Sequence, residues 1–307
     1  MTENVENVEN VGYYFKNFFD TEKDYFNLIQ DSHNFQSLTE SNKIGSSYRK
    51  GIYLTKVVKE NDYINFNLLR CSTNLDGPTD NFREIDNYIV DKVNKISKEY
   101  FKDSAELNHV LAQIYRNVTT ENLKEKKAKI KQHSDKTKDM PKNGLIAFCT
   151  FYKDIQLFTK SSNDQNDYVY KNTSVLTTLR FKLKDCVKDI TLKKKFDIKL
   201  YPNSVFIIPL ISNRLYTHEI VPSTLEIDKI PIRMGYVIRC SDTKAIYKDG
   251  YVYIDENEGY KQLEKITDEN IKELKELYFK ENVTDELVEY PNIYYSMNQG
   301  DYKEPIN

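Results

Sequence analysis

Short segments rich in β-branched and aromatic residues occupy much of the chain between residues 144 and 254. They are separated by Asn, Asp, Pro or Ser, which is typical of strands joined by turns. The last segment contains Asp249-Gly250, a dipeptide that predicts a β-hairpin. Because many strands follow one another without intervening helices, the pattern favours an antiparallel, double-sheet jelly roll. The segments are GLIAFCTFY (144–152), SVLTTLRFKL (174–183), SVFIIPL (204–210), IPIRMGYVIRC (230–240) and AIYKDGYVYI (245–254).

Two other segments have the spacing of amphipathic helices. The first runs from Arg83 to Tyr100, with Asp80 as its candidate N-cap, and is expected to pack on a sheet. The second is capped by Thr267 or Asp268 and is also expected to cover the sheet. The predicted fold class is therefore α+β, with a jelly-roll core, also called a double-stranded β-helix, and flanking helices.

The amino-terminal residues repeat the triplet ENV between positions 3 and 11. This segment is of low complexity and too polar to pack, so residues 1–12 are predicted to form a disordered tail. It has neither the basic start nor the apolar stretch of a secretory signal. No apolar run approaches the roughly 20 residues that a bilayer-spanning helix needs, so no membrane association is predicted.

The cysteines indicate the cellular compartment, and the charges indicate which ligands the protein could bind. The four cysteines lack paired spacing, which suits reduced thiols and predicts an intracellular protein, cytoplasmic or nuclear. The formal net charge of -2 argues against a molecule built as a whole to bind phosphate backbones. However, eight lysines lie between positions 124 and 142. They form either a solvated surface or a local anion-binding patch, and the charge pattern alone leaves both open.

A candidate metal site starts within that lysine-rich run, where the triplet HSD places His133 two residues before Asp135. A ferrous site of the facial type needs two imidazoles and one carboxylate on one side of the ion, so a second histidine must come from elsewhere. The remaining histidines are His33, His109 and His218. Packing roles are expected for the first two. The last follows an apolar strand and is the candidate third ligand.

Two arginines, Arg233 and Arg239, lie six residues apart in the predicted strand 230–240. Because side chains alternate along a strand, both should point to the same face. A dicarboxylate is a suitable partner, since the planar guanidinium binds a carboxylate through two hydrogen bonds. Structural salt bridges are the alternative for this pair.

Four segments stand in the order LNHVLAQIYRN (107–117), HSD (133–135), NRLYTHEI (213–220) and RMGYVIR (233–239). Together they resemble the Fe(II)/2-oxoglutarate-dependent dioxygenases, and within that superfamily the AlkB-like branch. The resemblance spans roughly residues 105–245. Gln113 and Gly235 stand where the family pattern has Asn, which affects the assignment to the branch more than it affects the iron site.

The resemblance implies a residue-by-residue assignment. The implied Fe(II) ligands are His133, Asp135 and His218, and the implied 2-oxoglutarate-binding residues are Tyr115, Arg233 and Arg239. The far carboxylate of 2-oxoglutarate would pair with Tyr115 and either arginine, and dioxygen would be the other co-substrate. The chain would then divide into an N-terminal region with substrate-lid elements and a supporting helix (13–103), an oxygenase core (104–260) and a C-terminal helical extension (261–307).

Family chemistry of this kind hydroxylates or oxidatively demethylates a substrate. Lysines near the metal ligands favour an anionic substrate, and single-stranded nucleic acid is the leading hypothesis. Lys131, Lys136 and Lys138 are expected to surround the cavity mouth. A protein or small-molecule substrate is an alternative, as is a non-catalytic binding module with the same jelly-roll shell. The sequence does not indicate an oligomeric state.

Overall fold

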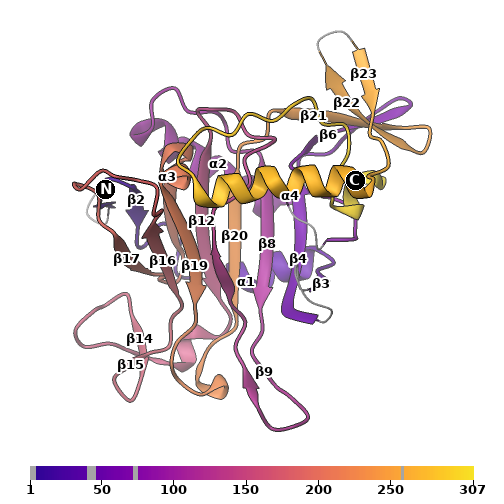
Figure 1. Ribbon diagram of the computed structural model, residues 1–307. Helices are drawn as coiled ribbons and strands as arrows, with labels where there is room; N and C mark the ends of the chain where they lie inside the picture. The colour runs from indigo at the N-terminus through magenta and orange to yellow at the C-terminus, as the bar shows by residue number, and fades with distance from the viewer. Residues whose placement is uncertain (1–4, 40–45, 72–74, 257–258) are drawn as a thin grey trace.

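Two β-sheets share an apolar core and form most of the molecule (Figure 1). The computed structural model describes residues 5–39, 46–71, 75–256 and 259–307. Within these ranges the strands are mostly antiparallel and the helices few. The four α-helices are α1 (Tyr25–Ser32), α2 (Glu84–Tyr100), α3 (Leu210–Leu215) and α4 (Asp268–Val283). Short 3-10 helices span Ile155–Leu157, Ile227–Lys229 and Gln299–Tyr302.

The larger sheet has nine strands in the order β1-β2-β18-β12-β20-β8-β4-β3, with β7 paired to β4 in parallel. Its strands are β1 (Val5–Val8), β2 (Gly12–Phe15), β3 (Gln36–Thr39), β4 (Ser46–Thr55), β7 (Asp80–Asn81), β8 (His109–Tyr115), β12 (Leu145–Tyr152), β18 (Ser204–Pro209) and β20 (Arg233–Arg239). The central strands β12, β20 and β8 are buried along almost their whole length. Their continuous apolar sequences follow from this burial on both faces.

The smaller sheet has four strands in the order β11-β19-β16-β17. They are β11 (Ile130–His133), β16 (Thr178–Leu183), β17 (Lys195–Lys199) and β19 (Tyr216–Val221). Three peripheral sheets complete the described strands. They consist of β5 (Val58–Glu60), β6 (Tyr63–Leu68), β21 (Thr243–Lys248), β22 (Tyr251–Glu256) and β23 (Gly259–Gln262); of β9 (Val118–Thr119) and β10 (Glu125–Lys126); and of β13 (Thr159–Lys160), β14 (Tyr168–Tyr170) and β15 (Thr173–Ser174).

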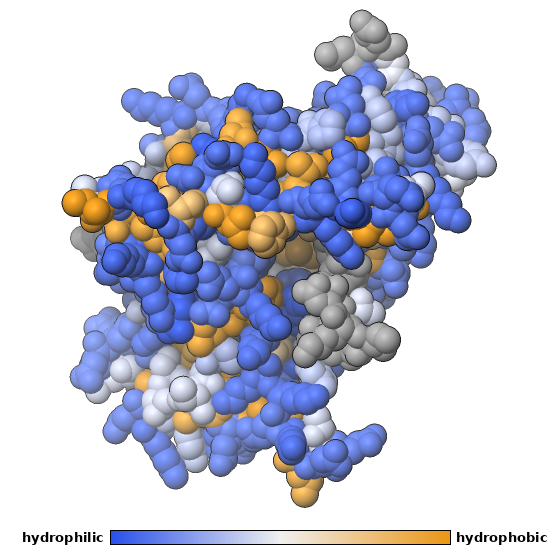
Figure 2. All heavy atoms as spheres, in the orientation of Figure 1, coloured by the Kyte–Doolittle hydropathy of each residue, from blue (hydrophilic) through white to orange (hydrophobic). Residues whose placement is uncertain are grey.

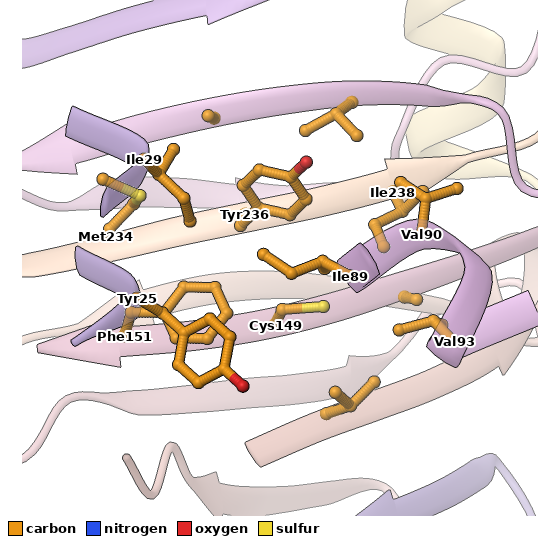
Figure 3. Packing of buried hydrophobic residues seen from close by; sticks show 14 of the residues in the cluster. Tyr25, Ile29, Ile89, Val90, Val93, Cys149, Phe151, Met234, Tyr236 and Ile238 are labelled. Atoms are coloured by element: carbon orange, nitrogen blue, oxygen red, sulfur yellow. The ribbon is translucent and has the colours of Figure 1, made fainter. Parts of the chain in front are cut away.

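Helices α1 and α2 cover the outer face of the larger sheet. Ile89 and Val93 of α2 pack on Cys149 and Tyr236 of the sheet, as Figure 3 shows. The predicted helix at 83–100 is therefore confirmed, but its predicted cap is wrong. Arg83 is the N-cap residue, and its backbone N–H donates to the Asp86 carboxylate. The predicted cap, Asp80, instead contacts His33 and Arg83 through its side chain.

The inner face of the larger sheet packs against the smaller sheet. Phe148 and Phe206 from the larger sheet meet Leu179 and Phe181 from the smaller sheet in one buried cluster. The alternation of side chains along each strand places these residues inward and their neighbours on the outer face. Every other residue of β8 and β20 therefore points into the space between the sheets, and this space is where the candidate site lies.

The strand predictions at 144–152, 204–210 and 230–240 are confirmed as β12, β18 and β20. Of the predicted strand 174–183, residues 178–183 form β16, and the first residue, Ser174, ends β15. The hairpin across Asp249-Gly250 is confirmed, and both residues have the positive φ that such a turn requires. However, this hairpin joins β6 in a peripheral sheet and is not part of the core.

Two boundaries predicted from the sequence are wrong. Residues 5–8 form β1, and Val8 and Val11 are buried in the core between the sheets, so this part of the predicted disordered tail is ordered; residues 1–4 lie outside the described residues. The expected division between residues 13–103 and 104–260 also fails. Strands β2, β3, β4 and β7 from the first range join β8, β12, β18 and β20 from the second in one sheet.

The predicted C-terminal helix is confirmed as α4, with Thr267 as its N-cap. Its buried residues Leu274 and Tyr278 cluster with Ile293 and Tyr295 of the segment that follows it, not with the sheet as predicted. Figure 1 shows α4 running across one end of the strands. Among the described residues, no helix is both long and apolar enough to cross a membrane.

Candidate metal centre

The two candidate histidine ligands face each other across neighbouring strands. His133 ends β11 and is paired in register with His218 of β19. Their ring centroids are 4.5 Å apart. The side chain of His218 is buried, whereas that of His133 is 31% exposed, so the pair lies at the edge of the core and is open to solvent on the His133 side.

Asp135 completes the group. One of its carboxylate oxygens, Oδ1, lies 3.6 Å from Nε2 of His133 and 3.8 Å from Nε2 of His218. The ligand atoms of the three residues all lie within 4.8 Å of one another. Two imidazole nitrogens and one carboxylate oxygen thus converge on one point, as a divalent metal requires. The structure therefore brings together the three residues, His133, Asp135 and His218, that were predicted as metal ligands.

The second carboxylate oxygen of Asp135 is held by Arg239. The Nε and Nη2 atoms of Arg239 donate to Oδ2 at 2.9 and 2.8 Å. Burial by itself would raise the pKa of Asp135, but the guanidinium of Arg239 outweighs this effect and holds the pKa well below its usual range. Asp135 is therefore a carboxylate at neutral pH, with Oδ1 directed at the histidines.

The backbone of Asp135 is fixed by Asn213 of α3. The amide N–H of Asp135 donates to Oδ1 of Asn213 at 2.9 Å, and Nδ2 of Asn213 donates back to the carbonyl of Asp135 at 3.0 Å. Asn213 is buried. It is the first residue of the segment NRLYTHEI, and its contact with Asp135 could not be predicted from the sequence.

Hydrogen bonding and burial leave both histidines able to bind a metal. Nδ1 of His133 lies 2.9 Å from the carbonyl of Lys131, which can only accept, so Nδ1 carries the proton and Nε2 is free. Burial lowers the pKa of His218 to about 3. The imidazole of His218 is therefore neutral at neutral pH, which is the form that binds metals.

A second candidate binding feature is a buried arginine of β20 that stacks on a tyrosine of β8. The guanidinium of Arg233 lies over the ring of Tyr115, with Cζ 4.0 Å from the ring centroid. Arg233 is buried, yet within the described part of the chain its Nε and Nη2 atoms have no hydrogen-bond partner. A buried guanidinium without an acceptor is costly, and it marks a place where an anion would bind.

Gln113 and Gly235, the two residues that depart from the family pattern, lie opposite each other beside Arg233. Gly235 is paired in register with Gln113, and the hydroxyl of Tyr115 donates to Oε1 of Gln113 at 3.0 Å. A Cβ atom at Gly235 would lie 3.0 Å from Nη1 of Arg233, so the guanidinium occupies the space that a side chain would need. On the other side, the buried hydroxyl of Thr150 faces Gly235 without a partner in the described structure. Sequence reasoning missed Thr150.

The expected ring of lysines around the cavity mouth is only partly present. Lys131 is exposed. Lys136 instead donates to the carbonyl of Tyr278 at 3.0 Å, beneath α4. Lys138 has a side chain that is 3% exposed and pairs with Asp139. Buried carboxylate and carbonyl groups attract these two lysines inward, which the local charge pattern could not reveal.

The packing roles expected for the other two histidines agree with the structure. His33 is buried between the carboxylates of Asp80 and Asp86 at 2.7 and 2.8 Å. His109 is buried on β8, opposite Arg239 in register. The four cysteines, all among the described residues, are free thiols.

Comparison with known proteins gives little more. No family model matches the chain, and no curated protein matches it. Among solved structures, 97 chains match. One of them, described as "The structure of OsALKBH1", is 13% identical with a TM-score of 0.41, and the match covers 77% of this chain and 99% of that one. A likeness this low carries no functional argument, so function is inferred from the site itself.

Proposed function

We propose that this chain is an Fe(II)- and 2-oxoglutarate-dependent dioxygenase of the AlkB-like type, with a double-stranded β-helix core. The observation that carries the proposal is the convergence of His133, Asp135 and His218 between two sheets, on the same side as a buried, unpartnered Arg233. Two imidazoles and one carboxylate are the donor set of non-haem iron oxygenases. Bound Fe(II) and 2-oxoglutarate would supply oxidation of a substrate C–H bond by dioxygen, coupled to decarboxylation of 2-oxoglutarate to succinate.

The two arginines have different proposed roles, which the sequence did not distinguish. Arg239 is engaged with Asp135 through two hydrogen bonds, so its role is to orient a metal ligand. Arg233 has free donors and is the better candidate for the far carboxylate of 2-oxoglutarate. The ring of Tyr115 lies against that guanidinium, and its hydroxyl donates to Gln113. Because Gly235 has no side chain, the guanidinium of Arg233 and the ring of Tyr115 can lie together over this position.

The test is anaerobic addition of Fe(II) and 2-oxoglutarate to the purified protein. The wild type should give the weak visible charge-transfer band of an Fe(II)–2-oxoglutarate chelate, and in air it should form succinate. His133→Ala, Asp135→Ala and His218→Ala should each lose both signals. His133 is partly exposed and its replacement should leave the fold intact, whereas Asp135→Ala leaves buried Arg239 without its partner, so urea unfolding of each metal-free variant establishes that it is folded. Succinate formation at the wild-type rate by the His218→Ala protein would contradict the proposal.

For the substrate we propose single-stranded nucleic acid. A groove of about 760 Å³ lies beside the histidine-bearing strands β11 and β19. Its lining includes Tyr48, Lys126, Lys127 and Lys129, and Lys126 lies over the ring of Tyr48. Cationic side chains next to an aromatic ring suit a phosphate backbone with stacked bases.

A salt titration with a labelled oligonucleotide, followed by fluorescence anisotropy, tests this substrate. Binding should weaken steeply as salt rises, because each neutralised phosphate releases counterions. Replacing Lys124, Lys126 and Lys127 by Gln should flatten the slope. No binding even at low salt would favour a protein or small-molecule substrate. If the wild type also forms no succinate, a binding module with the same shell becomes the better description.

A further inference from the structure

We propose that helix α4 positions two of the metal ligands, because its last turn holds the loop that joins His133 to Asp135. This inference rests on the proposed metal-dependent function. It concerns residues about 150 positions away in the sequence, since the contact between Ser134 and Asn282 spans 148 residues. The segment that contains them was expected to be an extension outside the core.

The decisive contact is made by the residue between the two ligands. The backbone N–H of Ser134 donates to Oδ1 of Asn282 at 2.7 Å. Ser134 is buried, and its hydroxyl donates to the carbonyl of Tyr216 at 3.2 Å. A change in the position of this peptide group therefore displaces His133 on one side and Asp135 on the other.

A second contact follows the ligands. The backbone N–H of Thr137 donates to Oε1 of Glu281 at 3.0 Å, and the hydroxyl of Thr137 donates to the same oxygen. Lys136 donates to the carbonyl of Tyr278 at 3.0 Å and lies over the ring of that tyrosine. Loop residues on both sides of Asp135 are therefore attached to one helical turn, and the loop cannot move independently of α4.

Helix α4 is itself anchored to the sheet that carries the ligands. Lys184, which directly follows β16, donates to the carbonyls of Glu281 and Thr284 at 2.5 and 2.9 Å. Strand β16 is the neighbour of β19, and Phe181 is paired in register with His218. The helix thus links the loop that carries Asp135 to the strand next to His218.

Figures 1 and 2 agree with this arrangement. Helix α4 runs across one end of the strands in Figure 1, and Figure 2 shows a hollow in the surface below it. The outer side of α4 carries exposed residues such as Glu276 and Phe279, whereas Asn282 and Glu281 face the loop. Side-chain changes on the outer side therefore serve as controls for changes on the inner side.

Metal affinity is the property that separates this role from simple packing. Groups that orient metal ligands typically contribute about 10–100-fold to affinity. If Asn282 only stabilised the fold, its replacement would lower the stability of the metal-free protein and leave the affinity of the folded protein unchanged. If it positions the ligands, the affinity of the folded protein falls.

The experiment uses the full chain and Co(II) as the probe, because its visible ligand-field bands report both binding and coordination geometry. The proteins are the wild type, Asn282→Ala, Asn282→Gln and the outer-side control Glu276→Ala. Thermal unfolding in EDTA establishes that each metal-free protein is folded. We expect Asn282→Ala to bind Co(II) about 10–100-fold more weakly with altered bands, and the control to match the wild type.

Asn282→Gln is included as a second variant so that the inference can be tested even if Asn282→Ala fails to fold. It keeps the amide but moves the acceptor by one methylene, so it should fold like the wild type and still bind Co(II) more weakly. Equal Co(II) affinity and equal spectra for a folded Asn282→Ala or Asn282→Gln protein and the wild type would overturn the inference alone. Failure of the wild type to bind Co(II) would overturn the proposed metal site, and the inference with it.

Discussion

Replacing Arg233 by Ala should separate co-substrate binding from fold stability. Arg233 is 4% exposed, and its Nε and Nη2 atoms have no acceptor among the described residues. Its removal therefore leaves no protein carboxylate unpaired. The contact that is lost within the protein is the stacking of the guanidinium on Tyr115.

The expected magnitudes follow from these contacts. Hydrogen bonds to charged groups contribute about 1.5–3 kcal/mol, so losing a two-point contact with a carboxylate should cost about 3 kcal/mol, or roughly 150-fold in Kd for 2-oxoglutarate. A cation–π contact contributes about 1 kcal/mol. Removing a buried charge without a partner offsets that loss, so the stability of the free protein should change by less than about 1 kcal/mol.

The measurement is anaerobic calorimetric titration of 2-oxoglutarate into Fe(II)-loaded protein, with urea unfolding of the metal-free protein alongside. Arg233→Lys should recover only part of the affinity, because an ammonium cannot form the planar two-point contact. Arg180→Ala is the matched control, since Arg180 pairs with Asp197 on the smaller sheet. An unchanged Kd in the Arg233→Ala protein would refute the assignment of this arginine to the co-substrate.

Three further predictions concern other parts of the site and its support. Gly235→Ala should weaken 2-oxoglutarate binding in the same titration by less than the loss of Arg233 does, because its Cβ would push the guanidinium aside; unchanged binding would show that this space is not used. Arg239→Met should destabilise the metal-free protein by about 3–5 kcal/mol in urea unfolding, since Asp135 is left buried and unpaired, and saturating Co(II) should recover part of the loss. Burial would lower the pKa of His33, but its two carboxylate partners raise the pKa to about 9. This stabilisation, on the order of 3 kcal/mol, is complete below about pH 6.5 and lost as the pH rises through 9, so the difference in urea midpoint between wild type and His33→Gln should shrink over that range and stay constant if His33 does not titrate.

Much of the site could be predicted from the sequence because its chemistry depends on residue types at short spacings. The triplet at 133–135 fixes an imidazole and a carboxylate two residues apart, and the alternation of a strand places Arg233 and Arg239 on one face. Both inferences depend on local geometry, and both hold in the structure. The strand at 204–210 and the helix at 83–100 were predictable for the same reason, since their apolar periodicity is local.

The separate tasks of the two arginines could not be predicted. Both are buried on β20, and the difference arises because Asp135 approaches one and not the other. Nor could the sequence place Lys136 and Lys138 inside the molecule, since their acceptors belong to distant or buried groups. The same holds for residues 5–11, which look too polar to pack but gain an ordered place by pairing with β18 through β2.

The sequence by itself therefore determined the short spacing of His133 and Asp135, the strand that carries the arginines and the predominance of antiparallel strands. The tertiary structure alone decided which arginine donors lack a partner among the described residues, which helix contacts the loop that follows His133, and which strands from the first hundred residues complete the main sheet. The physical reason is that residue type and periodicity act over a few positions along the chain. Hydrogen-bond partners, burial and the electrostatic surroundings of a charge depend on groups brought together from 100 or more residues apart, as for Asp135 with Arg239.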